Sequence, residues 1–225
     1  MPLLYSIGKI TVGNALKVGW RPRVEGLEHV PKTGGVIFAS NHLSVADELF
    51  LGAVVPRHLA FWAKSDYFDG TGLSGWFTRN LLNGLGAIRV ERAGGRAALA
   101  AFDGAIPVLK AGDQVVVYPE GTRSPDGRLY RGRTGVARLA IAAGVPIIPV
   151  GCLGTDKIQP IGQPYPSPVL RGGTITIKFG KPIDPVGRAD DRTSLRQLTD
   201  EVMVEIQKLT GQEYVPRYAP KKDPA

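Results

Sequence analysis

One loop and the helix expected after it hold a histidine and an aspartate suited to general-base chemistry. His42 and Asp47 lie in the segment Ser40–Asp47, SNHLSVAD, directly after the apolar run Val36–Ser40. On a regular helix, side chains five residues apart diverge by about 140°. They can meet only if His42 lies in the loop and Asp47 in the first helical turn. The carboxylate would then bind one imidazole nitrogen and leave the other to take a proton from a hydroxyl.

The same segment has a second interpretation that requires no chemistry. Ser44-Val45-Ala46-Asp47 has the form of a helix N-cap followed by an acidic residue in the first turn. Asp47 would then only cap its helix, and His42 would only follow a strand end. This segment by itself leaves both interpretations open.

A second loop combines groups that suit a phosphate. The buried-strand pattern Val115–Tyr118 ends in Pro119-Glu120-Gly121-Thr122-Arg123-Ser124. Such a loop can present backbone N–H groups, the Thr122 hydroxyl and the Arg123 guanidinium together, and the guanidinium can bind a phosphate through two parallel hydrogen bonds. A turn with a solvated basic face is the alternative, because further arginines follow at Arg128, Arg131 and Arg133.

Two further segments are less specific. Gly86-Ala87-Ile88-Arg89-Val90-Glu91-Arg92 reads as a strand that ends in charged residues, which are commonly solvated. Val145–Gly151, with the sequence VPIIPVG, is an apolar strand without a titratable group. We expect it to form either a pocket wall or plain core.

In this order the four segments resemble the glycerolipid acyltransferase family typified by 1-acylglycerol-3-phosphate acyltransferases. The family's motifs are N-H-x-x-x-x-D, G-x-x-x-(I/V)-(D/E)-R, (F/Y)-P-E-G-T-R-S and (V/I)-P-(I/V)-(I/V)-P-(V/I). All four match, and the matching region spans about residues 24–151, over half the chain. The departures are mild: Tyr118 stands where Phe is commoner, and Glu91 where Asp is commoner.

The resemblance implies a role for each matching residue. His42 would be the general base and Asp47 its orienting partner. The phosphate of the acceptor would be bound by Arg92, Glu120, Gly121, Thr122 and Arg123. The acyl or acceptor pocket would be lined by Val145, Pro146, Ile147, Ile148 and Pro149.

The resemblance also implies a reaction. A fatty acyl group would move from acyl-CoA or acyl carrier protein to the free hydroxyl of lysophosphatidic acid, giving phosphatidic acid in phospholipid biosynthesis. Another lysophospholipid, glycerol-3-phosphate or a lyso-aminolipid remains open as acceptor. A thioester is already activated, so we expect neither a metal ion nor another cofactor besides the co-substrate.

Other functions find less support in the sequence. A serine hydrolase would need a G-x-S-x-G elbow, which is missing, and Cys152 follows an apolar, buried pattern unsuited to a nucleophile. His29 and His58 are interpreted as structural. The 28 Lys and Arg against 20 Asp and Glu give a net charge of +8, which favours anionic partners. A nucleic-acid-binding module would also explain this charge, but its interleaved stacking aromatics are missing, so we expect no nucleic-acid partner.

Alternating strands and helices predict one α/β domain with a mostly parallel sheet covered by helices on both faces. Gly112 and Gly144 stand where two helices should end. The expected strands are Val36–Ser40, His58–Ala63, Ala87–Val90, Gln114–Tyr118, Pro146–Val150 and Thr174–Phe179. The expected helices are Val45–Val54, Gly72–Leu82, Arg96–Lys110, Thr134–Ala143 and Ser194–Leu209.

The two ends of the chain are expected to differ from this domain, which we place at residues 21–213. Residues 1–20 predict an amphipathic helix that either packs on the core or lies in an anionic membrane surface, with Lys9 and Lys17 meeting headgroups. Residues 214–225, rich in Pro and Lys, predict a flexible tail. No uninterrupted apolar run of about 18–20 residues occurs, and Cys152 is the single cysteine, so we expect a peripheral or monotopic protein on the cytoplasmic side of the cell membrane. The aromatic stretch 61–82 either faces that membrane or packs in the core.

Overall fold

The predicted α/β domain is confirmed. The structure, a computed structural model, describes residues 3–84, 86–90, 95–163, 166–167 and 175–220. Its strands are β1 (Arg23–Glu25), β2 (Val36–Ser40), β3 (Leu59–Ala60), β4 (Trp62–Lys64), β5 (Ile88–Val90), β6 (Gln114–Val117), β7 (Leu129–Tyr130), β8 (Ile147–Leu153), β9 (Thr176–Phe179) and β10 (Tyr214–Val215). Its α-helices are α1 (Leu3–Gly8), α2 (Asn14–Trp20), α3 (Ala46–Val54), α4 (Asp66–Asp69), α5 (Gly72–Gly84), α6 (Gly95–Lys110), α7 (Gly135–Ala143), α8 (Thr155–Ile158) and α9 (Arg192–Thr210).

Six strands form the main sheet in the order β1-β9-β8-β2-β6-β3. All neighbours are parallel except β8 and β9, so the sheet is mostly parallel, as predicted. β2 lies at its centre between β8 and β6, and all five of its residues are buried. This position explains its sequence, Val-Ile-Phe-Ala-Ser, which has no alternation of apolar and polar residues.

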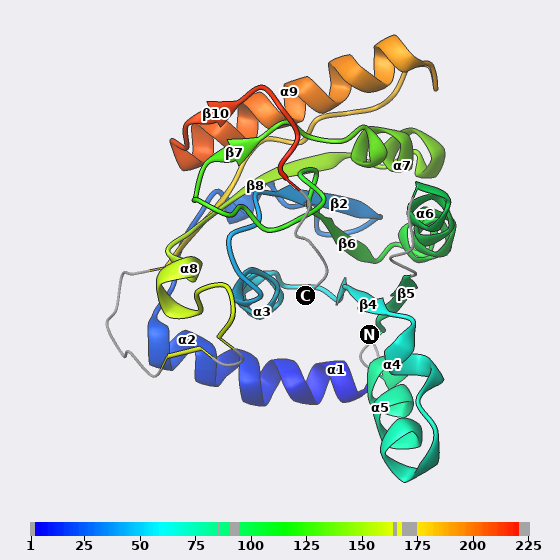
Figure 1. Cartoon of the computed structure of the whole chain (residues 1–225), viewed down its shortest axis with the longest axis vertical. Coiled ribbons are helices and arrows are strands. Elements are labelled where there is room, and N and C mark those ends of the chain that lie inside the picture. Colours follow the sequence, from blue (N-terminus) through cyan, green and yellow to red (C-terminus); the bar gives the residue numbers. More distant parts are fainter. Residues whose placement is uncertain (1–2, 85, 91–94, 164–165, 168–174, 221–225) are drawn as a thin grey trace.

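Helices cover both faces of the sheet, and the side chains of β2 alternate between two cores (Figure 1). Ile37 and Ala39 pack with α6, α7 and α9, whereas Val36 and Phe38 pack with α2 and α3. α9 buries Leu195, Leu198, Val202 and Ile206 on one side, whereas Leu209 is only half-buried. Gly144 takes a left-handed conformation (φ 66°) at the end of α7, as its position in the sequence predicts.

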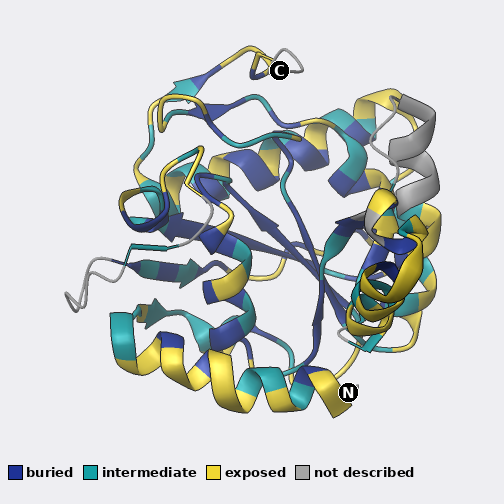
Figure 2. Ribbon diagram, turned by 60° about the horizontal axis from the view of Figure 1, so that its bottom comes forward, coloured by how far each residue is buried: buried dark blue, intermediate teal, exposed yellow. Residues whose placement is uncertain are grey.

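The N-terminal segment is helical from Leu3 to Trp20, with a π-helical turn, Lys9–Gly13, between α1 and α2. One side of it packs on the domain: Tyr5 and Leu16 are buried, and the Tyr5 hydroxyl accepts the N–H of Leu59 at 3.1 Å. Leu3, Ile7, Ile10 and Val18 are exposed, along the outward side of the helix (Figure 2). The contacts of this helix with the core of the domain are therefore made by residues other than these four.

Two predicted elements differ from the structure. The expected strand His58–Ala63 is split into β3, which joins the main sheet, and β4, which pairs with β5 in a separate one. The predicted tail 214–225 begins with β10, which pairs with β7, and Val215 and Ala219 are buried. The tail prediction is therefore wrong up to residue 220, and residues 221–225 lie outside the described residues.

Candidate active site

Three adjacent parallel strands bring the candidate residues to one edge of the sheet. β2 lies between β6 and β8, and the three run in the same direction. His42 follows β2, Glu120 follows β6 and Thr155 follows β8, each within three residues of its strand's end. The carboxyl ends of parallel strands are where ligands bind in sheets of this kind.

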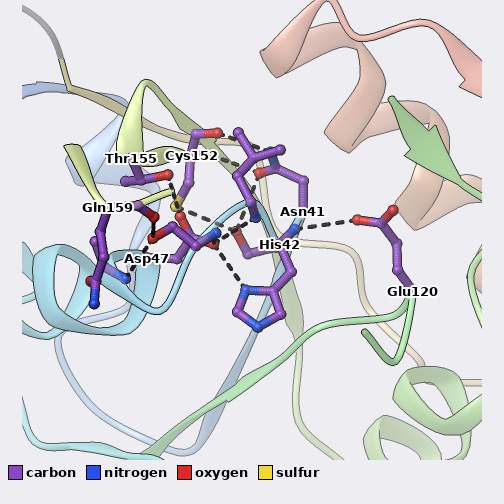
Figure 3. Close-up of polar contacts among 11 residues, drawn as sticks. Asn41, His42, Asp47, Glu120, Cys152, Thr155 and Gln159 are labelled. Carbon is purple, nitrogen blue, oxygen red and sulfur yellow. Dashed lines mark hydrogen bonds and ion pairs between the residues drawn. The ribbon is translucent and has the colours of Figure 1, made fainter. Parts of the chain in front are cut away.

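The predicted contact between His42 and Asp47 is present. Nδ1 of His42 lies 2.9 Å from Oδ2 of Asp47. His42 is in the loop after β2 and Asp47 in the first turn of α3, the one arrangement that their spacing allows. Asp47 is fully buried, and the other ring nitrogen of His42 points away from it (Figure 3). This geometry leaves Nε2 available to a ligand.

Asp47 also binds the backbone of the segment that leads into α3. Its Oδ2 accepts the N–H groups of Leu43 at 2.8 Å and Ser44 at 2.9 Å. The Ser44 hydroxyl in turn accepts the N–H of Ala46 at 3.1 Å. We call residues 40–47 the dyad loop, because its backbone and its histidine are held by the same carboxylate.

The loop after β6 supports His42 from the other side. The imidazole stacks on Tyr118, with ring centroids 3.8 Å apart and planes 16° apart. The N–H of Ser124 donates to the carbonyl oxygen of His42 at 2.7 Å. We call residues 119–133 the arginine loop. Through Ser124 this loop contacts the dyad loop directly.

Glu120 has a different environment from the one predicted. Its carboxylate accepts the N–H of His42 at 3.2 Å through Oε1 and that of Tyr130 at 2.9 Å through Oε2. Burial raises the pKa of Glu120 to about 7, and the nearby Asp47 adds to that effect. Because a carboxylate repels a phosphate and both its oxygens are occupied, Glu120 is placed to tie the two loops together. We therefore withdraw its assignment as a phosphate ligand.

The other predicted phosphate-binding residues of this loop lie next to Glu120 in the sequence. Gly121 has φ +76°, and its N–H donates to the carbonyl of Tyr118 at 3.0 Å, so the glycine makes the turn that carries Thr122 and Arg123. Thr122 and Arg123 are half-buried. Arg92 lies outside the described residues.

Two guanidinium groups of the arginine loop share one aromatic ring. Arg131 and Arg133 lie 5.6 Å and 4.8 Å from the centroid of Tyr218, in the segment after β10. Within the described ranges, neither of them nor Arg123 has a carboxylate within 4 Å, whereas Arg128 pairs with Asp126 at 2.7 Å. The loop therefore offers positive charge that no described acidic side chain neutralises.

The apolar motif does not form a common pocket wall. Val145 and Ile147 belong to the core under α6, α7 and α9, and Ile148 to the core on the opposite face. Pro149 is buried and Pro146 is half-buried. Successive residues of a strand point to opposite faces, so the assignment of Val145–Pro149 to one pocket is wrong and the core interpretation holds.

The alternative nucleophiles are poorly placed. Cys152 is fully buried, which raises the pKa of its thiol, and Ser40 donates to its Sγ at 3.4 Å. Ser44 donates to the carbonyl of Gln159 at 2.6 Å. Among the residues that the structure describes, no three His, Cys, Asp or Glu side chains gather as metal ligands.

Residues without an assigned role complete the site. The side chain of Asn41 donates to the Cys152 carbonyl at 2.9 Å and accepts its N–H at 2.8 Å. Thr155 donates to Oδ1 of Asp47. Asn41 lies inside a recognised motif, so the motif could have pointed to it, but nothing in the sequence marks Thr155 as a partner of Asp47.

Residues 21–153 match the acyltransferase family, and this match covers more than half of the chain, so the protein belongs to that family. A chloroplast 1-acyl-sn-glycerol-3-phosphate acyltransferase of Arabidopsis thaliana is 28% identical over 79% of this chain and 48% of its own length. An enzyme of the same name from Borreliella burgdorferi is 31% identical over 60% of this chain and 52% of its own. The chain thus spans about half the length of the curated relatives it matches.

A solved structure is similar to most of the fold. The crystal structure of the 1-acyl-sn-glycerophosphate acyltransferase from Thermotoga maritima is 29% identical in sequence, with a TM-score of 0.66. The match covers 92% of this chain and 76% of that one. The likeness therefore extends beyond the family match at residues 21–153.

Proposed function

We propose that this chain transfers a fatty acyl group from a thioester to the free hydroxyl of lysophosphatidic acid, giving phosphatidic acid. The His42–Asp47 pair carries the proposal, because a histidine held at Nδ1 by a buried carboxylate can accept a hydroxyl proton at Nε2. The names of the similar proteins, all 1-acylglycerol phosphate acyltransferases, support the choice of acceptor.

In the proposed reaction the acceptor's hydroxyl oxygen attacks the thioester carbonyl carbon while its proton moves to Nε2 of His42. The tetrahedral intermediate then collapses, the C–S bond breaks, and the thiolate leaves with the proton from the imidazolium. Asp47 stabilises the positive charge that His42 carries between these steps. The thioester is already activated, so the mechanism needs neither a metal ion nor a redox group.

Arg123 and Arg92 are the groups we assign to the acceptor's phosphate, with the Thr122 hydroxyl as a further donor. Arg123 precedes Ser124, whose N–H binds the carbonyl of His42, so the arginine is anchored next to the proposed base. A guanidinium without a carboxylate partner is free to bind a phosphate through two hydrogen bonds.

Product analysis with defined donors and acceptors tests the proposal. The purified chain is incubated with palmitoyl-CoA or palmitoyl acyl carrier protein and with lysophosphatidic acid, lysophosphatidylcholine, glycerol-3-phosphate or a lyso-aminolipid. We expect mass spectrometry to find phosphatidic acid with the wild type and none above background with His42→Ala. Acylation of another acceptor alone would refute lysophosphatidic acid as substrate. Acylation by the His42→Ala variant would refute the proposed base.

Exposed apolar side chains on two helices that contact each other support an anionic membrane as partner. α1 contacts α5, and Leu4 lies against Gly84 (Figure 1). The surface, which we call the apolar surface, consists of Leu3, Leu4, Ile7, Ile10, Val12 and Val18 on the N-terminal helix and Leu73, Trp76, Phe77 and Leu81 on α5. Such patches on single domains commonly mark interaction sites, and the +8 net charge favours anionic headgroups.

Details of the predicted membrane contact change with the structure. Lys17 is exposed, but Nζ of Lys9 donates to the carbonyls of Val55 and Arg57, so Lys9 is engaged within the protein. The aromatic stretch is divided: Trp76 and Phe77 are exposed, and Phe68 is buried. No helix in the described parts of the chain combines the length and the apolar composition needed to span a bilayer. We propose peripheral attachment on the cytoplasmic side of the membrane.

Vesicle flotation with point variants tests this attachment. Deleting the N-terminal helix would remove the buried Tyr5 and Leu16, so we choose the exposed pair Trp76→Ser and Phe77→Ser. The matched control is Val186→Ser with Val204→Ser, two apolar residues exposed outside the apolar surface. On phosphatidylglycerol vesicles we expect weaker binding for the first pair alone, and only partial loss of wild-type binding in high salt. Equal binding of both variants would refute this surface.

A further inference from the structure

The two oxygens of the Asp47 carboxylate are held in different ways. Oδ2 accepts three N–H groups, those of the His42 ring, Leu43 and Ser44, at 2.8–2.9 Å. Oδ1 accepts the hydroxyl proton of Thr155, the one donor that the described residues supply to it. Both Asp47 and Thr155 are fully buried, so water cannot readily replace that hydroxyl.

Thr155 reaches Asp47 because the dyad loop is fastened to the segment that follows β8. The side-chain amide of Asn41 forms two hydrogen bonds with the backbone of Cys152. The Ser44 hydroxyl donates to the carbonyl of Gln159, at the far end of α8. These contacts, together with the hydroxyl contact, join the two segments (Figure 3). The contacts of Asn41 and Ser44 act on backbone, whereas that of Thr155 acts on the carboxylate itself.

We propose that Thr155 is a positioning residue for the His42–Asp47 pair, an inference that rests on the proposed base role of His42. A carboxylate with all its donors on one oxygen can rotate about its Cβ–Cγ bond until both oxygens share them. The Thr155 hydroxyl opposes that rotation by occupying Oδ1 from the opposite side. Oδ2 then stays in line with Nδ1–H of His42, and Nε2 keeps the lone pair that accepts the substrate proton.

Two substitutions at one position separate the hydroxyl from the bulk of the side chain. Thr155→Val keeps the volume and removes the donor, while Thr155→Ser keeps the donor. We expect Thr155→Val to lower kcat at least about tenfold with little change in KM for the acceptor, because the base is misplaced and the arginine loop is untouched. Thr155→Ser should keep kcat within about threefold of the wild type, since its hydroxyl can still reach Oδ1.

Thr199→Val supplies a matched control. Thr199 is also fully buried, and its hydroxyl donates to the Leu195 carbonyl at 2.7 Å within α9, away from the dyad loop. This variant measures the cost of losing a buried threonine hydroxyl as such. We expect it to retain the wild-type kcat. If both valine variants lose kcat equally, the loss reflects general destabilisation of the fold, and the proposed positioning role of Thr155 is refuted.

Proton NMR of the His42 Nδ1–H gives a readout that does not depend on turnover. This hydrogen-bonded proton should resonate well downfield of the amide region in the wild type, Thr155→Ser and Thr199→Val, and broaden or disappear in Thr155→Val. An unchanged resonance and kcat in Thr155→Val would overturn the inference. Should His42→Ala prove active, the proposed function would fail, and the resonance would still decide whether Thr155 positions the pair.

Discussion

The dyad loop and the arginine loop lie side by side at the same sheet edge, yet they are built in opposite ways. In the dyad loop, both oxygens of Asp47 and the side chains of Asn41 and Ser44 are hydrogen-bonded within the protein. In the arginine loop, Arg123 and Arg133 have no carboxylate partner among the described residues. This difference fits the proposed roles, because a base must be oriented before the substrate arrives, whereas a phosphate-binding group must keep its charge uncompensated until then.

Removing the base should give the largest effect. His42→Ala is expected to lower kcat by about 10²–10⁴-fold, because the proposed general base is lost. Its thermal unfolding should change little, since the imidazole lies at the edge of the core and remains 15% exposed. Steady-state kinetics and a thermal melt of the same preparation check both expectations. A variant that loses its fold along with its activity would contradict the view that His42 serves chemistry alone.

Glu120 joins the two loops, and its titration sharpens the comparison. Between its ordinary value of 4.5 and its folded pKa of about 7, the folded protein holds a proton that the unfolded chain has lost. Stability contributed by this group therefore falls as pH rises across that window, by up to about 3 kcal/mol.

Glu120→Gln should remove this pH dependence. The amide side chain cannot accept both N–H groups, so we also expect the variant to lose a constant amount of unfolding free energy at every pH. Urea unfolding between pH 4.5 and pH 8 measures the free energy of unfolding of both proteins. As pH rises, the wild type should lose stability relative to the variant. Parallel stability curves for the two proteins would show that Glu120 does not titrate in this window.

Arg123→Ala tests the proposed role of the unpaired positive charge in the arginine loop. Losing a charge-assisted hydrogen bond costs about 1.5–3 kcal/mol, which corresponds to a rise of roughly 10–150-fold in the KM for lysophosphatidic acid. The KM for the acyl donor should stay nearly constant. Arg128→Ala is the matched control, because Arg128 is already paired with Asp126. Equal changes for the two variants would assign the effect to net charge rather than to a binding site.

The sequence predicts the sheet and its helices well because β2, β6 and β8 are buried on both faces and α9 has a clear apolar stripe. It also predicts the His42–Asp47 contact, since their spacing allows only one arrangement. It fails where a contact depends on tertiary structure alone. Thr155 is 108 residues from Asp47, and β10 forms only because its two residues meet β7.

The structure changes two site assignments for the same physical reason. Glu120 occurs within a phosphate-binding pattern, but only the fold reveals that its oxygens are occupied by the amides of His42 and Tyr130. Val145–Pro149 is apolar, and composition cannot distinguish a pocket wall from a strand whose two faces enter two cores. A motif indicates which residues matter, whereas the contacts in the fold indicate what each residue does.

Gly121→Ala should give the smallest effect, and it tests whether Arg133 takes part in the proposed acceptor site. Gly121 has φ +76°, so alanine there is strained by about 1–2 kcal/mol, and its Cβ would lie 3.1 Å from Nε of Arg133. That atom belongs to a flexible, exposed side chain, so we expect Arg133 to move rather than the backbone. Gly127→Ala is the control: Gly127 has φ +81° in the same loop, with no atom within 4 Å of an added Cβ. Urea unfolding should show similar losses of stability for both, whereas the KM for lysophosphatidic acid should rise only for Gly121→Ala. If the two variants have the same KM, Arg133 lies outside the acceptor site, and Arg123 remains the described arginine that we assign to the phosphate.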